Sequence, residues 1–224
     1  MPELADVAAA LADRTRARML EELLGGPPLS AGALAARVGV APSTVSGHLR
    51  KLEDAGLVTI ASVGRRREAR LAGPQVAEAL EALANIAGDT ARPIGLKAVN
   101  AHQAMREARS CYDHLAGRAG VALADQLQDH GALELRDGVF VVPPQTARYY
   151  RERFGFDPTR LHTRRPLVRA CVDWTERRPH VAGALGKALL DALLADGSLK
   201  RRKDGRALNV TRDFLSDDRR SAAA

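Results

Sequence analysis

The sequence predicts a mainly α-helical protein with small β-hairpins, and three observations support this fold class. Of the 224 residues, 46% are hydrophobic but only 4% are aromatic, which is typical of helices that pack through thin aliphatic cores. Apolar residues recur at helical spacing, and short β-prone stretches flank glycine-containing turns. The length suits two small domains. We expect one over residues 1–90 and another over 101–218, with a linker over 91–100 and a frayed tail over 219–224.

The charge and the apolar pattern limit the classes of partner. A formal net charge of +7 indicates an anionic partner. The longest apolar runs fall well short of the roughly 18 residues that span a bilayer, and the N-terminus has no secretory signal pattern. We therefore expect a cytoplasmic protein with no membrane partner, whose two cysteines are thiols.

The first domain shows helices that end at clear stop signals. Residues 4–26 carry apolar residues at helical spacing and are followed by two prolines. A short helix follows Ser30, which is a plausible N-cap, and a longer helix is expected over residues 42–55. Residues 57–60 then predict a strand, and residues 64–71 a basic hairpin that pairs with it.

A helix, a tight turn, a second helix and a basic two-stranded hairpin form the order of a winged helix-turn-helix. The second helix presents short hydroxyls that can reach base edges and phosphates. Arginines of the hairpin can neutralise the DNA backbone or enter the minor groove. The residues that we expect to contact double-stranded operator DNA are Pro42, Ser43, Thr44, Ser46, Gly47, His48, Arg50, Arg65, Arg66, Arg67 and Arg70.

Three segments of the first domain resemble a known family. LADRTRARML, LAARVGVAPSTVSGHLRKLEDAGLV and GRRREARL are similar to the ArsR/SmtB family of dimeric bacterial repressors, and the V-S-x-H-L element at Val45–Leu49 is the most specific part. The resemblance covers residues 1–90. It implies a recognition helix over Pro42–Ala55 and dimerisation through the first helix and the helix after the wing. On that last helix the apolar stripe is Val76, Leu80, Leu83 and Ala87.

The chain departs from the family at its familiar metal sites. Many members carry a cysteine pair in the helix before the recognition helix, but residues 34–40 contain no cysteine. Others carry Asp and His ligands on the last dimer helix, but residues 75–87 contain no histidine. Ala41 also stands where a capping Ser is usual. The resemblance therefore gives no metal site in the first domain.

The second domain contains an internal duplication. HLAGRAGVALADQLQDHGAL (114–133) and HVAGALGKALLDALLADGSL (180–199) are identical at ten of twenty positions without a gap. A Cys-x-Asp element precedes each copy and an Asp-Gly turn follows each one, at Asp137 and at Asp204. We interpret the domain as two degenerate winged-helix-like repeats, at about 111–142 and 171–212, each with a helix followed by a small hairpin and related by a pseudo-twofold.

The duplication makes six residues candidates for an effector site, because equivalent positions of two repeats can face each other across a pseudo-twofold. Thiolates and imidazoles suit zinc or another soft divalent metal, and paired cysteines can respond to oxidants. A seam between repeats can also bind a small organic molecule. Equally, the aspartates can be helix N-caps and the cysteines can be core residues. The six candidates are Cys111, Asp113, His114, Cys171, Asp173 and His180.

These observations predict a homodimeric DNA-binding repressor whose second domain senses an effector, either a soft metal or a thiol-reactive signal. The alternatives are a repressor that responds to a small organic ligand and an architectural DNA-binding protein without an effector. We expect no enzyme and no catalytic residues, because the sequence has no phosphate-binding Gly loop and no nucleophile elbow.

Overall fold

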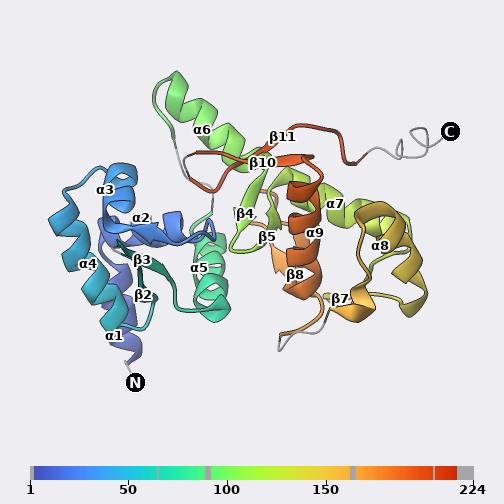
Figure 1. Cartoon of the computed structure of the whole chain (residues 1–224), viewed down its shortest axis with the longest axis horizontal. Helices are drawn as coiled ribbons and strands as arrows, with labels where there is room; N and C mark the ends of the chain where they lie inside the picture. The colour runs from blue at the N-terminus through green and yellow to red at the C-terminus, as the bar shows by residue number, and fades with distance from the viewer. Residues whose placement is uncertain (1–2, 65, 89–91, 162–164, 204, 216–224) are drawn as a thin grey trace. The chain divides into compact units, whose positions relative to one another are not determined.

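The computed structural model divides the chain into two compact units, which we describe separately (Figure 1). The first unit comprises residues 1–83 together with 203–206, and the second comprises the rest. No helix in the described part of the chain is both long and apolar enough to cross a membrane. The structure describes residues 3–64, 66–88, 92–161, 165–203 and 205–215.

The first unit is a small helical domain with one three-stranded sheet. All strand pairs of this sheet are antiparallel and their order is β1-β3-β2. The elements in chain order are α1 (Leu4–Leu11), α2 (Arg14–Leu23), β1 (Leu29–Ser30), α3 (Ala31–Val38), α4 (Pro42–Asp54), β2 (Val58–Val63), β3 (Arg66–Leu71) and α5 (Pro74–Ala87). This is the winged helix-turn-helix that the sequence predicts, with α3 and α4 as the helix pair and β2–β3 as the wing.

Local signals place the ends of these helices. Asp13 accepts a hydrogen bond from Arg16 N and so caps α2, which divides the predicted first helix into α1 and α2. Ser30 accepts from Ala33 N at 3.2 Å and caps α3, as predicted. Gly39 ends α3 in the left-handed conformation, and Pro42 begins α4. Each stop and start of the helix pair therefore follows from the residue at that position.

The core of the first unit is aliphatic. Met19, Leu20 and Leu34 are buried from α2 and α3, while Val45 and Leu52 are buried from one face of α4. The apolar residues of α4 lie on one face and the polar residues on the other, because they alternate at helical spacing. Burying the apolar face therefore leaves the polar face of α4 in solvent. The core thus fixes which side of α4 is presented outward.

The described part of the second unit contains four two-stranded hairpins and three helices of 12 or 13 residues, α6, α7 and α9. It begins within α5, and α6 follows Gly95, so residues 96–100 are helical where the sequence predicts linker. Its elements are α6 (Leu96–Glu107), β4 (Arg109–Cys111), β5 (His114–Ala116), α7 (Arg118–Asp129), β6 (Glu134–Arg136), β7 (Val139–Val141), α8 (Ala147–Phe154), β8 (Arg169–Val172), β9 (Pro179–Ala182), α9 (Gly183–Ala195), β10 (Leu199–Arg201) and β11 (Leu208–Val210), with short 3-10 turns at Pro144–Thr146 and Pro158–Arg160.

One order of elements occurs twice in this unit. A hairpin, a helix and a second hairpin follow one another as β4–β5, α7, β6–β7 and again as β8–β9, α9, β10–β11. The sequence predicts only the helix and the hairpin after it, so the leading hairpin corrects the predicted repeat. The first Asp-Gly turn joins β6 to β7 with positive φ at both residues, as a tight hairpin turn requires. Asp204, in the second predicted turn, lies outside the described residues.

The helices α7 and α9 each pack against a hairpin of the other half of the unit. α7 packs against β9 and α9 packs against β5, so each helix covers the leading hairpin of the other half. Gly120 and Gly186 permit the close approach of each helix to the hairpins of both halves. A Cβ on Gly120 would lie 2.6 Å from Leu115 O in its own half and 3.6 Å from His180 Cβ in the other. One on Gly186 would overlap the Val181 carbonyl in its own half and lie 3.0 Å from His114 Cβ in the other. This packing also brings β5 beside β9.

Candidate nucleic-acid interface and Cys/His cluster

The outer face of α4 carries the residues that the sequence predicts to contact DNA. Ser43, Thr44 and Arg50 are exposed, as is Pro42 at the helix start. Ser46 is exposed too, and its hydroxyl donates to Pro42 O at 2.9 Å, which leaves its oxygen lone pairs for an external donor. The face is therefore polar, accessible and made of short side chains beside one arginine.

Two residues of the same helix that the sequence also predicts to contact DNA are less exposed. Gly47 and His48 are half-buried. A Cβ on Gly47 would meet no atom within 4 Å, so internal packing does not explain why glycine stands there. Glycine inside a helix costs about 0.5–1 kcal/mol relative to alanine, and an approaching surface would have the closest access to the backbone at this point.

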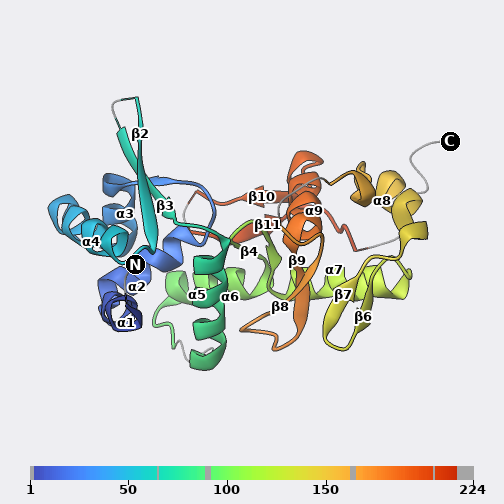
Figure 2. The ribbon, with the colours of Figure 1, turned by 90° about the horizontal axis from the view of Figure 1, so that it is seen from below.

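The wing extends beyond the helices of the first unit (Figure 2). β2 and β3 pair along six residues each, from Val58 opposite Leu71 to Val63 opposite Arg66. Arg66, Arg67 and Arg70 are exposed, and Arg70 Nε donates to Thr59 Oγ1 at 3.2 Å on the neighbouring strand. Arg65 lies outside the described residues. The described wing thus presents at least three guanidinium groups to solvent.

The stripe on α5 that the resemblance assigns to dimerisation is incompletely covered. Val76 and Leu80 are half-buried, whereas Ala87 is exposed and the Leu83 side chain is 46% exposed. Ile86, which the sequence reasoning did not include, is 82% exposed. An apolar helix face of this kind is available for a partner surface.

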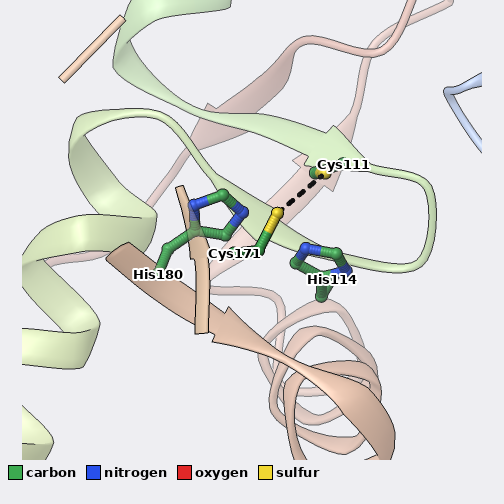
Figure 3. Close-up of side chains that lie close together, drawn as sticks. All are labelled: Cys111, His114, Cys171 and His180. Carbon is green, nitrogen blue, oxygen red and sulfur yellow. Dashed lines mark hydrogen bonds between the residues drawn. The ribbon is translucent and has the colours of Figure 1, made fainter. Parts of the chain in front are cut away.

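The four cysteine and histidine candidates lie on the two leading hairpins, one pair on each. Cys111 and His114 are direct cross-strand partners in β4–β5, and Cys171 and His180 are direct partners in β8–β9. Because β5 lies beside β9, the two pairs meet, and Figure 3 shows the four side chains pointing toward one another.

The ligand atoms of this Cys/His cluster lie close together. One atom from each of the four residues can be chosen so that all lie within 4.8 Å of one another. The sulfurs of Cys111 and Cys171 are 4.0 Å apart, which is too long for a disulfide, and the imidazole rings of His114 and His180 stack with centroids 5.1 Å apart. Three of the four residues are buried and Cys171 is partly exposed.

Each imidazole of the cluster turns Nδ1 toward an aspartate. His114 Nδ1 is 3.4 Å from Asp113 Oδ1, and His180 Nδ1 is 3.7 Å from Asp173 Oδ2. The Nε2 atoms of both histidines are buried and have no hydrogen-bond partner among the described residues. His180 Nδ1 is also buried without a hydrogen-bond partner in the described part of the chain. Three such nitrogens in one small volume require an explanation, since burying polar atoms without partners is costly.

The aspartates are not helix N-caps, so that interpretation of Asp113 and Asp173 is wrong. Residue Gly117 precedes α7 and Ala182 precedes α9, with no side-chain cap at either. Asp173 instead accepts from Gly117 N at 2.7 Å, in the other half of the unit. The hairpins displace the aspartates from the helix starts, because each Cys-x-Asp element lies in or beside a strand or its turn.

Two arginines fix the aspartates. Arg165 Nη1 donates to Asp113 Oδ2 at 2.6 Å, and the fully buried Arg109 donates to Asp173 Oδ2 at 2.9 Å. Arg109 also lies over the ring of Trp174, 4.6 Å from its centroid. Burial alone would raise the pKa of Asp173, but Arg109 and the neighbouring donors hold it well below its usual range.

Sequence reasoning missed both arginines, although one signal was present. RSCYD (109–113) and RACVD (169–173) share Arg-x-Cys-x-Asp, so Arg109 belongs to the repeated motif. In space Arg109 pairs with the aspartate of the other copy. Asp113 is bound by Arg165, which lies outside the repeated motif. The halves are therefore only partly equivalent.

The cluster favours a thiolate beside an imidazolium when no ion is bound. Burial opposes protonation of His114, but the Asp113 carboxylate and the Cys171 sulfur overcome it and raise the pKa of His114 to about 8. The Cys111 thiol, acting as a hydrogen-bond donor, lowers the pKa of Cys171 far below that of an ordinary thiol, and both imidazoles act in the same direction against burial. Thiolate is the form that binds metals and reacts with oxidants.

The known proteins to which this chain is similar include HTH-type transcriptional regulators. Residues 11–61 match a family model described as a helix-turn-helix domain. The uncharacterized HTH-type transcriptional regulator YdfF of Bacillus subtilis is 36% identical over 210 residues, covering 94% of this chain and 92% of that protein. The HTH-type transcriptional regulator CmtR of Mycobacterium bovis is 42% identical over 92 residues, covering 40% of this chain and 77% of CmtR. A solved homodimeric winged helix-turn-helix domain from M. bovis, titled a possible ArsR-family regulator, is 32% identical, with a TM-score of 0.36 over 38% of this chain and 77% of that one.

Proposed function

The chain belongs to the HTH-type transcriptional regulators, and we propose that it is a dimeric, ArsR-type repressor of transcription whose second unit senses an effector at the Cys/His cluster. In this proposal the first unit binds double-stranded operator DNA and the second unit adjusts that affinity. No catalytic role is proposed for any residue.

Binding of operator DNA by α4 and the wing is supported by the polarity of α4. Its apolar face is buried, so Ser43, Thr44 and Arg50 can enter a major groove without uncovering the core. The wing arginines, among them Arg66 and Arg67, would neutralise phosphates on either side. We propose the whole predicted set of α4 and wing residues, including Arg65, as the DNA-contacting surface.

A homodimer is supported by the exposed apolar side chains on α5. Leu83 and Ile86 would remain in water in a single chain, and a second copy of the same helix would cover them. Val76, Leu80 and Ala87 complete the proposed interface. A twofold dimer also suits an inverted-repeat operator, because each half-site then meets an identical α4.

The test of DNA binding is in vitro selection of genomic fragments with the full chain, followed by fluorescence anisotropy at fixed salt. Arg50→Ala should weaken binding to the selected site by about 1–3 kcal/mol if Arg50 contacts a base. Arg118→Ala, which removes an exposed arginine from α7, is the matched control and should leave affinity unchanged. Equal affinities for wild type and Arg50→Ala would contradict this assignment of the recognition helix.

The sensing role rests on the buried nitrogens of the cluster. His114 Nε2 and His180 Nε2 are buried without partners among the described residues, and both face a pair of thiols. A soft metal ion would satisfy all four groups at once. Binding of such an ion would therefore stabilise the cluster.

A thiol-reactive signal is the second candidate, because Cys171 is partly exposed and its pKa is lowered. Hydrogen peroxide would take two electrons from the two thiols and be reduced to two molecules of water. The sulfurs of Cys111 and Cys171, 4.0 Å apart, would then form one disulfide. Such a bond would join the two leading hairpins covalently.

The same anisotropy assay separates these candidates. Zinc, cadmium and hydrogen peroxide are added in turn to wild type and to Cys171→Ser, with Ser110→Ala as a control on the neighbouring hairpin. A change of at least fivefold in operator affinity that Cys171→Ser abolishes supports sensing at the cluster. A response that survives Cys171→Ser points to an organic effector elsewhere. No response to any agent or to cell metabolites would indicate an architectural DNA-binding protein and contradict the sensor.

A further inference from the structure

We infer that the two leading hairpins form a closed four-coordinate site for one zinc-type ion per chain. Its ligands are the sulfurs of Cys111 and Cys171 and the Nε2 atoms of His114 and His180. The inference deepens the proposed function and rests on it for the role of the ion as a signal. It adds the ion class, the ligand atoms and the residues that position them.

The spacing of the ligand atoms fits a small tetrahedral ion. An ion with bonds of about 2.0–2.3 Å to four tetrahedral ligands holds those ligands about 3.3–3.8 Å apart. The two sulfurs are already 4.0 Å apart, and one nitrogen of each histidine can be chosen so that all four candidate atoms lie within 4.8 Å of one another. Contraction by less than about 1.5 Å along each edge would complete the coordination, which side-chain rotations can supply.

The aspartates fix which imidazole nitrogen meets the ion. A carboxylate near Nδ1 favours the tautomer with the proton on Nδ1, so the lone pair lies on Nε2. This arrangement occurs twice, as Asp113 with His114 and Asp173 with His180. In both cases Nε2 is buried and has no hydrogen-bond partner among the described residues; His180 Nδ1, 3.7 Å from Asp173 Oδ2, also makes no hydrogen bond there. The structure thus presents two imidazoles in the orientation that metal-binding histidines require.

The carboxylates are themselves held in place. Arg165 binds Asp113, while Arg109 and Gly117 N bind Asp173. We assign Asp113 and Asp173 as positioning residues, because they act through the histidines and lie outside the set of four ligands. Their removal should weaken ion binding without changing the donor set.

The donor set and its burial select the class of ion. Two nitrogens and two sulfurs in a tetrahedral arrangement are typical of zinc, whereas magnesium and calcium require oxygen ligands. Two thiolates and two neutral imidazoles around a divalent ion give a site of zero net charge, which lowers the cost of burying the ion. With four protein ligands no position remains open, which suits a structural or sensing ion.

The test is cobalt(II) titration of the full-length protein under reducing conditions, followed by visible absorption. We expect the d–d bands of tetrahedral cobalt and a thiolate charge-transfer band, saturating at about one ion per chain and lost when zinc is added. Cys171→Ser should lose the charge-transfer intensity of one thiolate. His102→Ala, which removes a histidine from α6, is the matched control and should keep the wild-type spectrum and affinity.

Asp113→Asn tests the positioning role. We expect the tetrahedral cobalt spectrum to persist while the affinity for zinc, measured by competition with a chelator, falls about 10–100-fold. A purely structural role would leave zinc affinity unchanged in the folded variant and would overturn the assignment. Far-UV circular dichroism identifies folded variants, and a folded wild type that takes up no cobalt overturns the site whatever the variants do.

Failure of this inference and failure of the proposed function have different signatures. Tetrahedral cobalt binding without any effect of zinc on operator affinity would uphold the site and contradict its role in sensing. An operator response to hydrogen peroxide, in a protein that binds no cobalt, would overturn the zinc site and leave the sensor proposal standing.

Discussion

Replacing Gly186 with alanine tests the packing that builds the cluster. A Cβ at this position would overlap the Val181 carbonyl oxygen and lie 3.0 Å from His114 Cβ. Overpacking of this kind costs about 1–3 kcal/mol, and the better helix propensity of alanine returns up to about 1 kcal/mol. We therefore expect Gly186→Ala to lower the free energy of unfolding of the second unit by about 1–2 kcal/mol and to weaken zinc binding, because the shift displaces His114.

Urea unfolding followed by tryptophan fluorescence measures this effect in the correct unit. Trp174 is the sole tryptophan and belongs to the second unit. With a urea m-value of about 2 kcal/mol/M, the midpoint should fall by about 0.5–1 M. Gly47→Ala is the matched control, because its new Cβ would meet no atom within 4 Å in α4.

The control substitution is expected to raise the free energy of unfolding, whereas Gly186→Ala should lower it. Gly47→Ala should stabilise the first unit by about 0.5–1 kcal/mol in circular dichroism and leave the Trp174 midpoint unchanged. A Gly186→Ala protein as stable as wild type, or more stable, would refute the close approach of α9 to the hairpins.

Three further predictions address the wing, the dimer and pH. Arg67→Ala should weaken binding to all DNA sequences alike and reduce the slope of log affinity against log salt by about one; an unchanged slope with altered sequence preference would indicate base contacts instead. Leu80→Asp should place an unpaired charge in the proposed interface and give monomers in sedimentation that bind DNA poorly, whereas a wild type that is monomeric at micromolar concentration would contradict the dimer. The hydroxyl of Tyr150 donates to Ala132 O, and burial raises the pKa of this hydroxyl. The neutral hydroxyl therefore contributes fully to stability below the unfolded-state pKa of about 10, and this contribution is lost as the pH rises above that value. Tyr150→Phe should reduce this alkaline loss in urea titrations between pH 9 and 11 (about the range set by that pKa), and an unaltered pH profile would count against the buried hydrogen bond.

Much of the first unit could be predicted because its signals are local. The spacing of Val45, Leu49 and Leu52 identifies the buried face of α4, and Gly39 and Pro42 mark the turn before it. The division between α1 and α2 at Asp13 was missed, because a continuous apolar periodicity hides a single capping residue.

In the second unit the sequence indicated which residues can lie together but assigned the wrong local structure to them. Duplication alone indicated that Cys111 and Cys171 can face each other, and they do so. The hairpin at Cys111–His114 carried no turn signal, because Tyr112 takes positive φ (59°) where glycine or asparagine is usual. The pairing of Arg109 with Asp173 depends on how the two hairpins pack, which no local pattern encodes.

The central claim is that ion binding at the Cys/His cluster and DNA binding by α4 are coupled, and the most direct test is zinc affinity measured with and without saturating operator DNA. Linkage requires that operator DNA change zinc affinity by the same factor by which zinc changes operator affinity, with factors of about 5–150 typical of such coupling. We predict equal factors within error for wild type. Arg50→Ala should bind zinc normally and give a factor near one at operator concentrations that saturate wild type but are too low for this variant to bind. A zinc affinity that saturating operator leaves unchanged would contradict the account.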